Sequence, residues 1–500
     1  LPDAWRMSGN AARTPTYALN TGRGMTNSMQ QESAGKTAGG FAWARALPAI
    51  RYDLEVPDGA RRALALGWLA LALASLLGSG IFSVLLVASR TPYFKDVFPL
   101  VDFFRVALVV HVDLSVLVWF LALAGVLWSI NSAERLINTG WSALAFAAVG
   151  TILMCAAPFA GGGNPVMSNY VPVLDDPLFL AGLTTFCAGF LLLVVRSLAA
   201  APLIGVRFDG AGALRFGLNA AAVASAVTLI ALAWSYFEMP SGLPARGYYD
   251  ILFWGAGHVV QFTYTLLMLV AWLWLASSCG ARVPLTPRLT VLLLATGLLS
   301  VFLIPVIYLA YGVTSIEHRH MMTWLMQFGG GLAIAPLGAA VAWGMWRAGA
   351  LPERARPLRA ALIASMVLFA VGGAIGFVIQ GSNVKIPAHY HGSIVGVTLA
   401  LMGMVYLLLP RLGFAEPAPR LATWQAWLYG AGQLLHIIGL LWSGGYGVQR
   451  KVAGSEQMLR TSGEIAGMGL MGLGGLIAVI GGLLFVVVVI RAMLPGARPR

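Results

Sequence analysis

Charged residues and cysteines are both scarce in this 500-residue chain. Asp, Glu, Lys and Arg make up 10% of the residues and hydrophobic residues 59%, whereas soluble domains carry about 25% charged residues. A soluble enzyme and a disordered chain are therefore excluded. The three cysteines are isolated, and neither a CxxC nor a CxxCH motif occurs. This excludes a disulfide framework, a zinc ribbon and a covalently attached c-type haem.

Long apolar segments recur from residue 63 to the end of the chain. Each can cross a bilayer, which takes about 20 residues in a helix. They predict an all-α membrane protein with a bundle of twelve transmembrane helices in a single domain, residues 49–500. Residues 1–48 are rich in Ser, Gly, Ala and Asn, which predicts a flexible cytoplasmic tail. The predicted spans are 63–90, 102–130, 140–161, 175–198, 213–237, 248–278, 286–312, 318–346, 357–380, 388–410, 422–443 and 465–493.

The net charge of +13 indicates how the bundle is oriented. An excess of positive charge can attract nucleic acid, but in a membrane protein it also reflects topology, because loops rich in Lys and Arg stay in the cytoplasm. Most of the 32 Lys and Arg residues fall in segments on the same side as the N-terminus. We therefore predict cytoplasmic N- and C-termini, the lipid bilayer as surroundings and no nucleic-acid partner.

Histidines recur in the apolar spans. All seven histidines lie within these spans or at their edges, and ionisable residues inside lipid are costly and usually functional. Side chains two residues apart on a helix point about 200° away from each other, so the helix carrying His389 and His391 can bind a metal centre on each side. Six of the seven lie in the outer halves of even-numbered spans, where they can converge on one layer: His111, His258, His318, His320, His389 and His391.

Three segments around these histidines resemble subunit I of the haem-copper oxidase superfamily: GSNVKIPAHYHGSIVGVTLALMGMVYLLLPRLG, HVDLSVLVWF and FWGAGHVVQF. The resemblance implies a twelve-helix fold of the subunit I type that holds two haems and one non-haem iron or copper. It implies that His389 binds a high-spin haem. It further implies that His111 and His391 bind the two faces of a low-spin haem, which we expect to be of b type. By the same resemblance, His258 binds the non-haem metal.

The chain departs from the family pattern at this non-haem metal. Oxygen-reducing members carry an adjacent His-His pair at the end of span 7, where this chain reads LIPVIYLAYGVTSIEHRHMM. The nearest replacements are His318 and His320. Both can face inward if the segment is not helical, whereas in a helix only one can, and Glu317 then becomes the substitute ligand. A carboxylate beside imidazoles favours iron over copper. The alternative is a solvated loop without a metal.

A second departure concerns the tyrosine that many oxygen-reducing members have four residues after the span-6 histidine. Position 262 of this chain is Phe. Tyr308 and Tyr311 on span 7 could replace it, whereas Tyr264 points about 240° away from His258 on a helix. Gln261 lies one turn beyond His258 and could hydrogen-bond a bound gas. The candidate catalytic residues are His258, Gln261, Glu317 and Tyr311.

Proton supply is a third difference from the pumping members, which lift protons along Lys, Asp and Glu side chains. The inner halves of spans 6 to 10 contain none of these residues. With the stretches NPVMSNYVPVLDDPLF and GHVVQF, these features resemble the alternative nitric oxide reductases of the superfamily. The predicted reaction is 2 NO + 2 e⁻ + 2 H⁺ → N₂O + H₂O. A terminal oxygen reductase and a non-catalytic haem gas sensor remain as alternatives.

Other predictions concern partners and supporting residues. Arg450 and Lys451, in GGYGVQRKVAG, resemble the family's paired basic residues that bind haem propionates, and His436 is expected to be a packing residue. Since the chain has no motif for attaching a c-type haem or binding dinuclear copper, an electron-donating subunit with cytochrome c or dinuclear copper is implied. We place the protein in a bacterial inner membrane, with a small gas as substrate.

Overall fold

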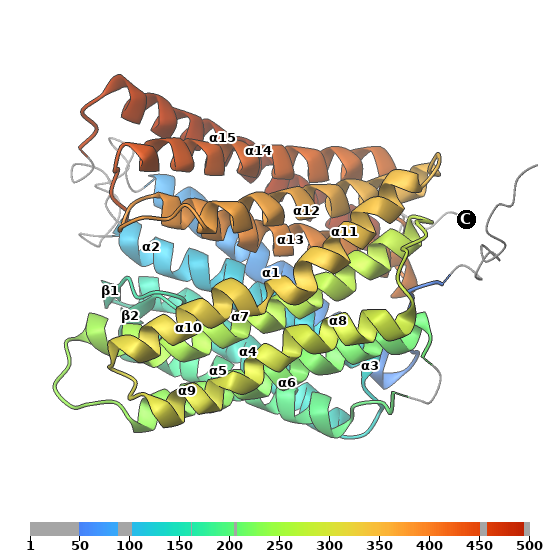
Figure 1. Cartoon of the computed structure of the whole chain (residues 1–500), viewed down its shortest axis with the longest axis horizontal. Helices are drawn as coiled ribbons and strands as arrows, with labels where there is room; N and C mark the ends of the chain where they lie inside the picture. The colour runs from blue at the N-terminus through green and yellow to red at the C-terminus, as the bar shows by residue number, and fades with distance from the viewer. Residues whose placement is uncertain (1–49, 89–102, 162, 205–207, 451–457, 495–500) are drawn as a thin grey trace, which may run out of the picture. The chain divides into compact units, whose positions relative to one another are not determined.

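The structure, a computed structural model, describes residues 50–88, 103–161, 163–204, 208–450 and 458–494. The predicted tail, residues 1–48, and Lys451 lie outside these ranges. In the described residues the chain forms long helices and one two-stranded antiparallel hairpin (Figure 1). The hairpin strands are β1 (Asn164–Val166) and β2 (Val173–Asp175), in the connection between the third and fourth spans.

The helices account for all twelve predicted spans. Eleven stretches of the described residues are long and apolar enough to cross a membrane, and the twelfth is the 27-residue helix α14. The helices are α1 (Ala60–Ala88), α2 (Phe103–Val112), η2 (Asp113–Val118), α3 (Trp119–Asn131), α4 (Ile137–Ala156), η3 (Ala157–Phe159), α5 (Pro177–Ala199), α6 (Gly210–Phe237), α7 (Ala245–Ser278), α8 (Pro287–Leu299), η4 (Ser300–Leu303), α9 (Ile304–Ala310), α10 (Ile316–Gly329), α11 (Gly331–Arg347), η5 (Glu353–Ala355), α12 (Arg356–Gly376), α13 (Lys385–Arg411), α14 (Pro419–Gly445) and α15 (Ser462–Met493).

Three spans are interrupted helices. The second contains a π-helical turn, η2, which begins two residues after His111. The seventh is broken by the 3-10 turn η4, and the eighth is divided at Gly330 into α10 and α11. Because π-helical turns are rare and frequently occur at functional sites, the turn beside His111 indicates that this part of the second span is a candidate functional region.

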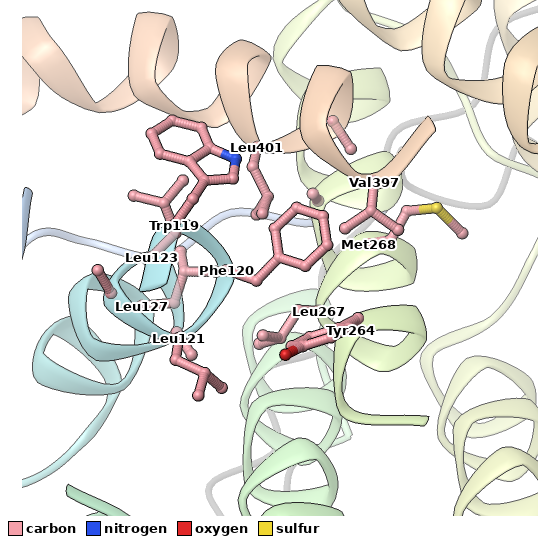
Figure 2. Close-up of a cluster of buried hydrophobic side chains, with 14 of the residues drawn as sticks. Trp119, Phe120, Leu121, Leu123, Leu127, Tyr264, Leu267, Met268, Val397 and Leu401 are labelled. Carbon is pink, nitrogen blue, oxygen red and sulfur yellow. The ribbon is translucent and has the colours of Figure 1, made fainter. Parts of the chain in front are cut away.

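The two most buried spans carry three of the histidines. In α7 and α13, 89% of the membrane-crossing window is buried, a larger share than in any other described span. Figure 2 shows the core between them: Trp119 and Phe120 of α3 pack with Leu267 of α7 and Leu401 of α13. Since His258 lies on α7 and His389 on α13, the packing of this core holds the two helices that carry these side chains.

Helix α14 approaches its neighbour α15 closely because glycines face each other. A Cβ atom added to Gly474 would lie 2.3 Å from the backbone nitrogen of His436, and one added to Gly439 would lie 2.4 Å from that of Met471. Small residues allow such backbone contact between membrane helices. This contact holds His436 at a fixed position against α15.

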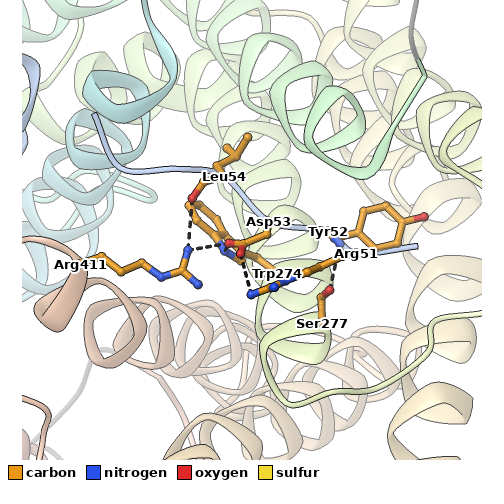
Figure 3. Close-up of polar contacts among 7 residues, drawn as sticks. All are labelled: Arg51, Tyr52, Asp53, Leu54, Trp274, Ser277 and Arg411. Atoms are coloured by element: carbon orange, nitrogen blue, oxygen red, sulfur yellow. Dashed lines mark hydrogen bonds and ion pairs between the residues drawn. The ribbon is translucent and has the colours of Figure 1, made fainter. Parts of the chain in front are cut away.

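The segment that precedes α1 is tied to the ends of two spans (Figure 3). The carboxylate of Asp53 accepts hydrogen bonds from the guanidinium of Arg411 and, at 2.7 Å, from the indole nitrogen of Trp274. Burial alone would raise the pKa of Asp53, but the hydrogen bonds from these residues and the positive charges of Arg411 and Arg51 bring it below its usual value. Asp53 is therefore ionised and joins α13 to α7.

We expect Asp53→Asn to lower the apparent melting temperature of the detergent-solubilised protein by a few degrees. The substitution removes the charge that faces Arg411. Their ion pair is partly buried, and an ion pair of intermediate burial contributes about 1–3 kcal/mol to the stability. Because the folded-state pKa lies below the unfolded value, this contribution is fully present above about pH 4 and is lost as the pH falls through the folded-state pKa. The difference from wild type should therefore be largest near neutral pH and shrink in acid.

The matched control is Asp58→Asn. The side chain of Asp58 is 96% exposed, and its ion pair with Arg62 is 3.4 Å long. Exposed pairs contribute little, so this variant should melt like wild type. Equal melting temperatures of Asp53→Asn and wild type at pH 7 would contradict the stabilising role of Asp53.

Candidate functional site

Five of the seven histidines line one cavity of about 3270 Å³ in the described part of the chain. Ligand pockets usually measure about 300–1,000 Å³, so this cavity has room for more than one large prosthetic group. Apolar side chains form most of its wall. His111, His258, His389 and His391 therefore share one cavity, and His436 joins them.

The two predicted low-spin haem ligands have the hydrogen bonding of metal-binding imidazoles. Nδ1 of His111 lies 2.9 Å from the carbonyl oxygen of Ser79, and Nδ1 of His391 lies 2.8 Å from that of Pro387. A carbonyl oxygen can only accept, so each Nδ1 carries the proton and each Nε2 keeps its lone pair. Metal-bound histidines are commonly oriented by such a bond. Both residues are thus prepared to bind iron through Nε2.

The predicted high-spin haem ligand, His389, follows the same pattern from the other side of α13. Its Nδ1 donates to the carbonyl oxygen of Gly372 on α12, 2.7 Å away. The ring lies against Gly376, where an added Cβ atom would come within 2.9 Å of it. The neighbouring helix therefore fixes the ring orientation of His389.

His436 was expected to be a packing residue, but it lies among the candidate ligands. Its ring centroid is 5.0 Å from that of His391. Its Nδ1 donates to the carbonyl oxygen of Met471 at 2.9 Å, so its Nε2 is also unprotonated. The only signal in the sequence was its position inside an apolar span, which does not reveal which residues surround it.

His258 is held on both sides of its ring. Its Nδ1 donates to the carbonyl oxygen of Trp254 at 2.7 Å, and its Nε2 accepts from the hydroxyl of Tyr170 at 2.9 Å. Tyr170 comes from the loop between β1 and β2 and was not among the predicted site residues. Its φ of 67° lies in the left-handed region, which costs a residue other than glycine about 1–3 kcal/mol and is often found at functional sites.

The other three predicted metal ligands lie outside the lining of the cavity that contains His258. Helix α10 begins at Ile316, so Glu317, His318 and His320 are all helical and point in different directions. Only one of the three side chains can therefore face the interior of the bundle. His318 does so: it is 1% exposed, packs edge-on against Tyr308 at 4.8 Å, and both ring nitrogens lack a hydrogen-bond partner among the described residues. Glu317 and His320 are exposed, and neither these two nor His318 lines the cavity.

The described side chains do not gather into the predicted four-residue metal site, which stays a prediction. In the part of the chain that the structure describes, no group of three or more His, Cys, Asp or Glu side chains could hold a metal ion. The physical reason is the helical register of α10, which turns Glu317 away where His318 turns in. In the part of the cavity near Trp254, Nε2 of His258 is the protein atom best suited to bind a metal, because Nδ1 of the same ring is hydrogen-bonded to the carbonyl oxygen of Trp254.

Some of the candidate catalytic side chains line the cavity and others do not. Gln261 lines the cavity, and its amide donates to the carbonyl oxygen of Gly257 at 3.3 Å. Tyr311 is 37% exposed and does not line the cavity. Tyr308 is buried, but its hydroxyl bonds to Ser235 at 2.7 Å outside the cavity lining.

Two arginines supply positive charge to the cavity wall. Arg450 lines it and donates to the hydroxyl of Ser382 at 3.3 Å. Arg319 also lines it and lies over the ring of Trp254 at 4.6 Å. Guanidinium groups pair well with carboxylates, as expected for haem propionates. With the cavity volume and the unprotonated Nε2 atoms, the residues present fit two haems, whereas the non-haem metal has fewer protein ligands than predicted.

Comparisons with known proteins identify the family of this chain. Residues 63–495 match the protein family described as cytochrome c and quinol oxidase polypeptide I. An uncharacterized protein of Rickettsia prowazekii is 28% identical over 498 residues, covering 86% of this chain and 96% of the relative. An uncharacterized protein of Aquifex aeolicus is 26% identical over 365 residues, covering 70% and 85%.

A solved structure shares the fold. The cryo-EM structure of a haem-copper terminal oxidase dimer matches with a TM-score of 0.66 at 15% identity, covering 89% of this chain and 86% of that chain. Such low identity shows the fold alone. Because the family match spans most of the chain, this protein belongs to the haem-copper oxidase subunit I family and is an oxidoreductase of that superfamily.

Proposed function

We propose that this chain is the catalytic subunit of a membrane nitric oxide reductase, with the reaction 2 NO + 2 e⁻ + 2 H⁺ → N₂O + H₂O. The observation that carries the proposal is the altered surroundings of His258. The adjacent His-His pair of oxygen-reducing members is missing, and the residue one turn beyond His258 is the buried Phe262. Joining two NO molecules involves no O–O bond, so a phenol at that position is not required.

The residues divide into a part for electron transfer and a part for gas binding. His111 and His391 would hold one haem from both faces and leave no position for gas. His389 would hold the second haem from one face and leave the other face open toward the cavity. Bound haem iron would supply the redox and gas-binding chemistry. The apolar wall limits access of water, and Gln261 on the same wall can donate a hydrogen bond to a bound gas.

Two features support proton uptake from the outer side. Lys, Asp and Glu are absent from the inner halves of spans 6 to 10. The cavity wall, by contrast, contains five histidines together with Arg319 and Arg450, and we expect this wall in the outer half of the membrane. A nitric oxide reductase that takes protons from outside needs no charged residues in the inner halves of these spans.

Oxygen reduction is the second candidate, and one contact favours it. The hydroxyl of Tyr170 lies 2.9 Å from Nε2 of His258, so a phenol is present at the site although position 262 lacks one. Tyr264 also lines the cavity. A terminal oxygen reductase would use such a phenol as a source of an electron and a proton.

Members of this superfamily receive electrons from partners, and we propose a partner subunit that carries cytochrome c or dinuclear copper. The described helices are those of an integral membrane protein. We place it in a bacterial inner membrane with both termini in the cytoplasm, because Lys and Arg gather in the loops on that side.

Gas consumption by the purified protein tests the proposed function. The protein is supplied with a chemical reductant, and NO, N₂O and O₂ are followed in separate runs. We expect one N₂O for every two NO consumed. Oxygen uptake without NO consumption would replace the proposal with an oxygen reductase, and neither activity, with no metal beyond haem iron, would indicate a gas sensor.

A further inference from the structure

Three arginines from three different helices meet at the turn between α3 and α4. Arg61 of α1 and Arg215 of α6 donate to backbone carbonyl oxygens of this turn at 2.8 and 3.2 Å. Arg196 of α5 reaches a third carbonyl oxygen at 3.5 Å. The three carbonyl oxygens belong to the consecutive residues 131–133. Arg61 is close enough to the other two arginines to repel both electrostatically, so three like charges are gathered at one turn.

Acidic side chains do not pair with this arginine cluster. Among the ion pairs of the described residues, none includes Arg61, Arg196 or Arg215. Asp209 and Glu55 attract Arg215 electrostatically without forming an ion pair with it, and the carboxylate of Asp209 caps the start of α6. The positive charge of the cluster is therefore left without a salt bridge in the described part of the chain.

Arg196 is the member of the cluster that most requires an anion. Its side chain is 0% exposed, and its Nε and Nη1 have no hydrogen-bond partner among the described residues. The hydroxyl of Ser132, in the same turn, is also buried without a described partner. A buried charge without a partner is strongly destabilising. An anion held by the half-buried Arg61 and Arg215 would stabilise Arg196 through the low-dielectric interior without touching it.

The first turn of α4 adds positive potential at the same place. A Cβ atom added to Gly140 would lie 2.8 Å from Nε of Arg196, so this side chain packs against the start of α4. The helix start has no side-chain cap, and the free N–H groups at a helix start attract anions. The arginines and the helix start therefore attract the same kind of ligand, a compact anion such as phosphate.

The surroundings of the cluster favour a phospholipid as the source of this phosphate. Leu136 and Trp141 follow the turn and Leu198 follows Arg196, and all three side chains are exposed. Exposed apolar side chains beside basic ones suit a ligand with a charged head and acyl chains. The cluster also lies at the ends of spans that we expect to face the cytoplasm, where the leaflet carries acidic lipids that bind in basic pockets between helices.

We propose that Arg61, Arg196 and Arg215 form a site for a phosphate group that an acidic phospholipid supplies. Arg61 and Arg215 would donate hydrogen bonds to the phosphate oxygens, because guanidinium groups pair well with phosphate. The negative charge would stabilise the buried Arg196, and the lipid would join α1, α5 and α6. None of the three arginines lines the histidine cavity, so the proposal does not depend on which gas the protein reduces.

The dependence of stability on lipid tests the proposal in the full-length protein. The protein is stripped of lipid in a mild detergent, and its apparent melting temperature is measured with phosphatidylglycerol, with phosphatidylcholine or with inorganic phosphate. We expect phosphatidylglycerol to raise it by a few degrees. Phosphatidylcholine, whose phosphate is neutralised by its own choline, should raise it much less. Equal shifts with both lipids would overturn the site, and the full shift with inorganic phosphate alone would overturn the lipid as its source.

Arg215→Gln removes one of the two arginines that would contact the phosphate. We expect it to weaken phosphatidylglycerol binding at least about tenfold, since hydrogen bonds between charged groups are the strong ones, and to lose most of the shift in melting temperature. The matched control is Arg62→Gln, which removes a charge from the same end of α1. The guanidinium of Arg62 donates to the carbonyl oxygen of Leu412 instead, so this variant should keep the wild-type shift. An unchanged shift in Arg215→Gln would contradict the proposal.

Arg196→Met tests the proposal through the sign of its effect. Without lipid the variant should melt at or above the temperature of wild type, because it removes a buried charge that has no partner. With phosphatidylglycerol its shift should be smaller than that of wild type, because the phosphate no longer stabilises a buried charge. A lower melting temperature without lipid, together with an undiminished shift with phosphatidylglycerol, would show that Arg196 has no part in the site.

Discussion

Replacing His391 with Ala should remove the absorption and magnetic signature of the low-spin haem and lower turnover by at least about a hundredfold. The ligand itself is lost, and even changes beside a ligand commonly cost 10–100-fold. His111→Ala should do the same, because each imidazole is fixed by its own carbonyl partner, Ser79 or Pro387. Low-temperature electron paramagnetic resonance, together with haem quantification, measures the result.

His436→Ala is the matched control for this prediction. Its ring lies 5.0 Å from that of His391, in the same cavity and with the same type of Nδ1 hydrogen bond. We expect the variant to keep the low-spin signature. If His391→Ala retained two-imidazole ligation and only the double variant lost it, His436 would be a ligand and the assignment of His391 would be wrong.

Replacing His258 with Ala should remove the non-haem metal and abolish gas reduction, while both haems stay bound. His258 is 4% exposed and lines the cavity, whereas the proposed haem ligands lie on α2 and α13. The expected result is the absence of metal beyond haem iron, with an unchanged low-spin signature. Metal analysis and an NO electrode measure the two effects.

The control for this variant is His320→Ala. The sequence pattern made His320 a candidate ligand, but the structure turns it outward, stacked on Trp324 at 6.2 Å. Metal content and activity should therefore match wild type. Loss of the metal in His320→Ala would show that the segment rearranges to bring this imidazole to His258.

The spans and the layer of histidines could be predicted from the sequence because both depend on local pattern. Hydropathy over about 20 residues decides which segments enter a bilayer, and position along a span sets the depth of a histidine. Helices therefore occur at all twelve predicted spans, and His111, His258, His389 and His391 share one cavity. The two-residue spacing of His389 and His391 also placed them on opposite sides of α13.

The residues that complete the site depend on contacts between distant segments. Tyr170 reaches His258 from a hairpin loop 88 positions away, and no spacing along one helix encodes such a contact. His436 joins His391 because glycines let α14 pack closely on α15. The segment around Glu317 allowed two conformations until its helical start at Ile316 was known.

The sequence by itself determined a membrane bundle with histidines in its spans, because the cost of exposing polar groups to lipid constrains each span separately. The haem-ligand candidates followed from the resemblance to the family. Only the tertiary structure decided which side chains face the cavity. It brought Tyr170 and His436 in and turned Glu317, His320 and Tyr311 out, because helix rotation and loop path follow from packing against neighbours rather than from hydropathy.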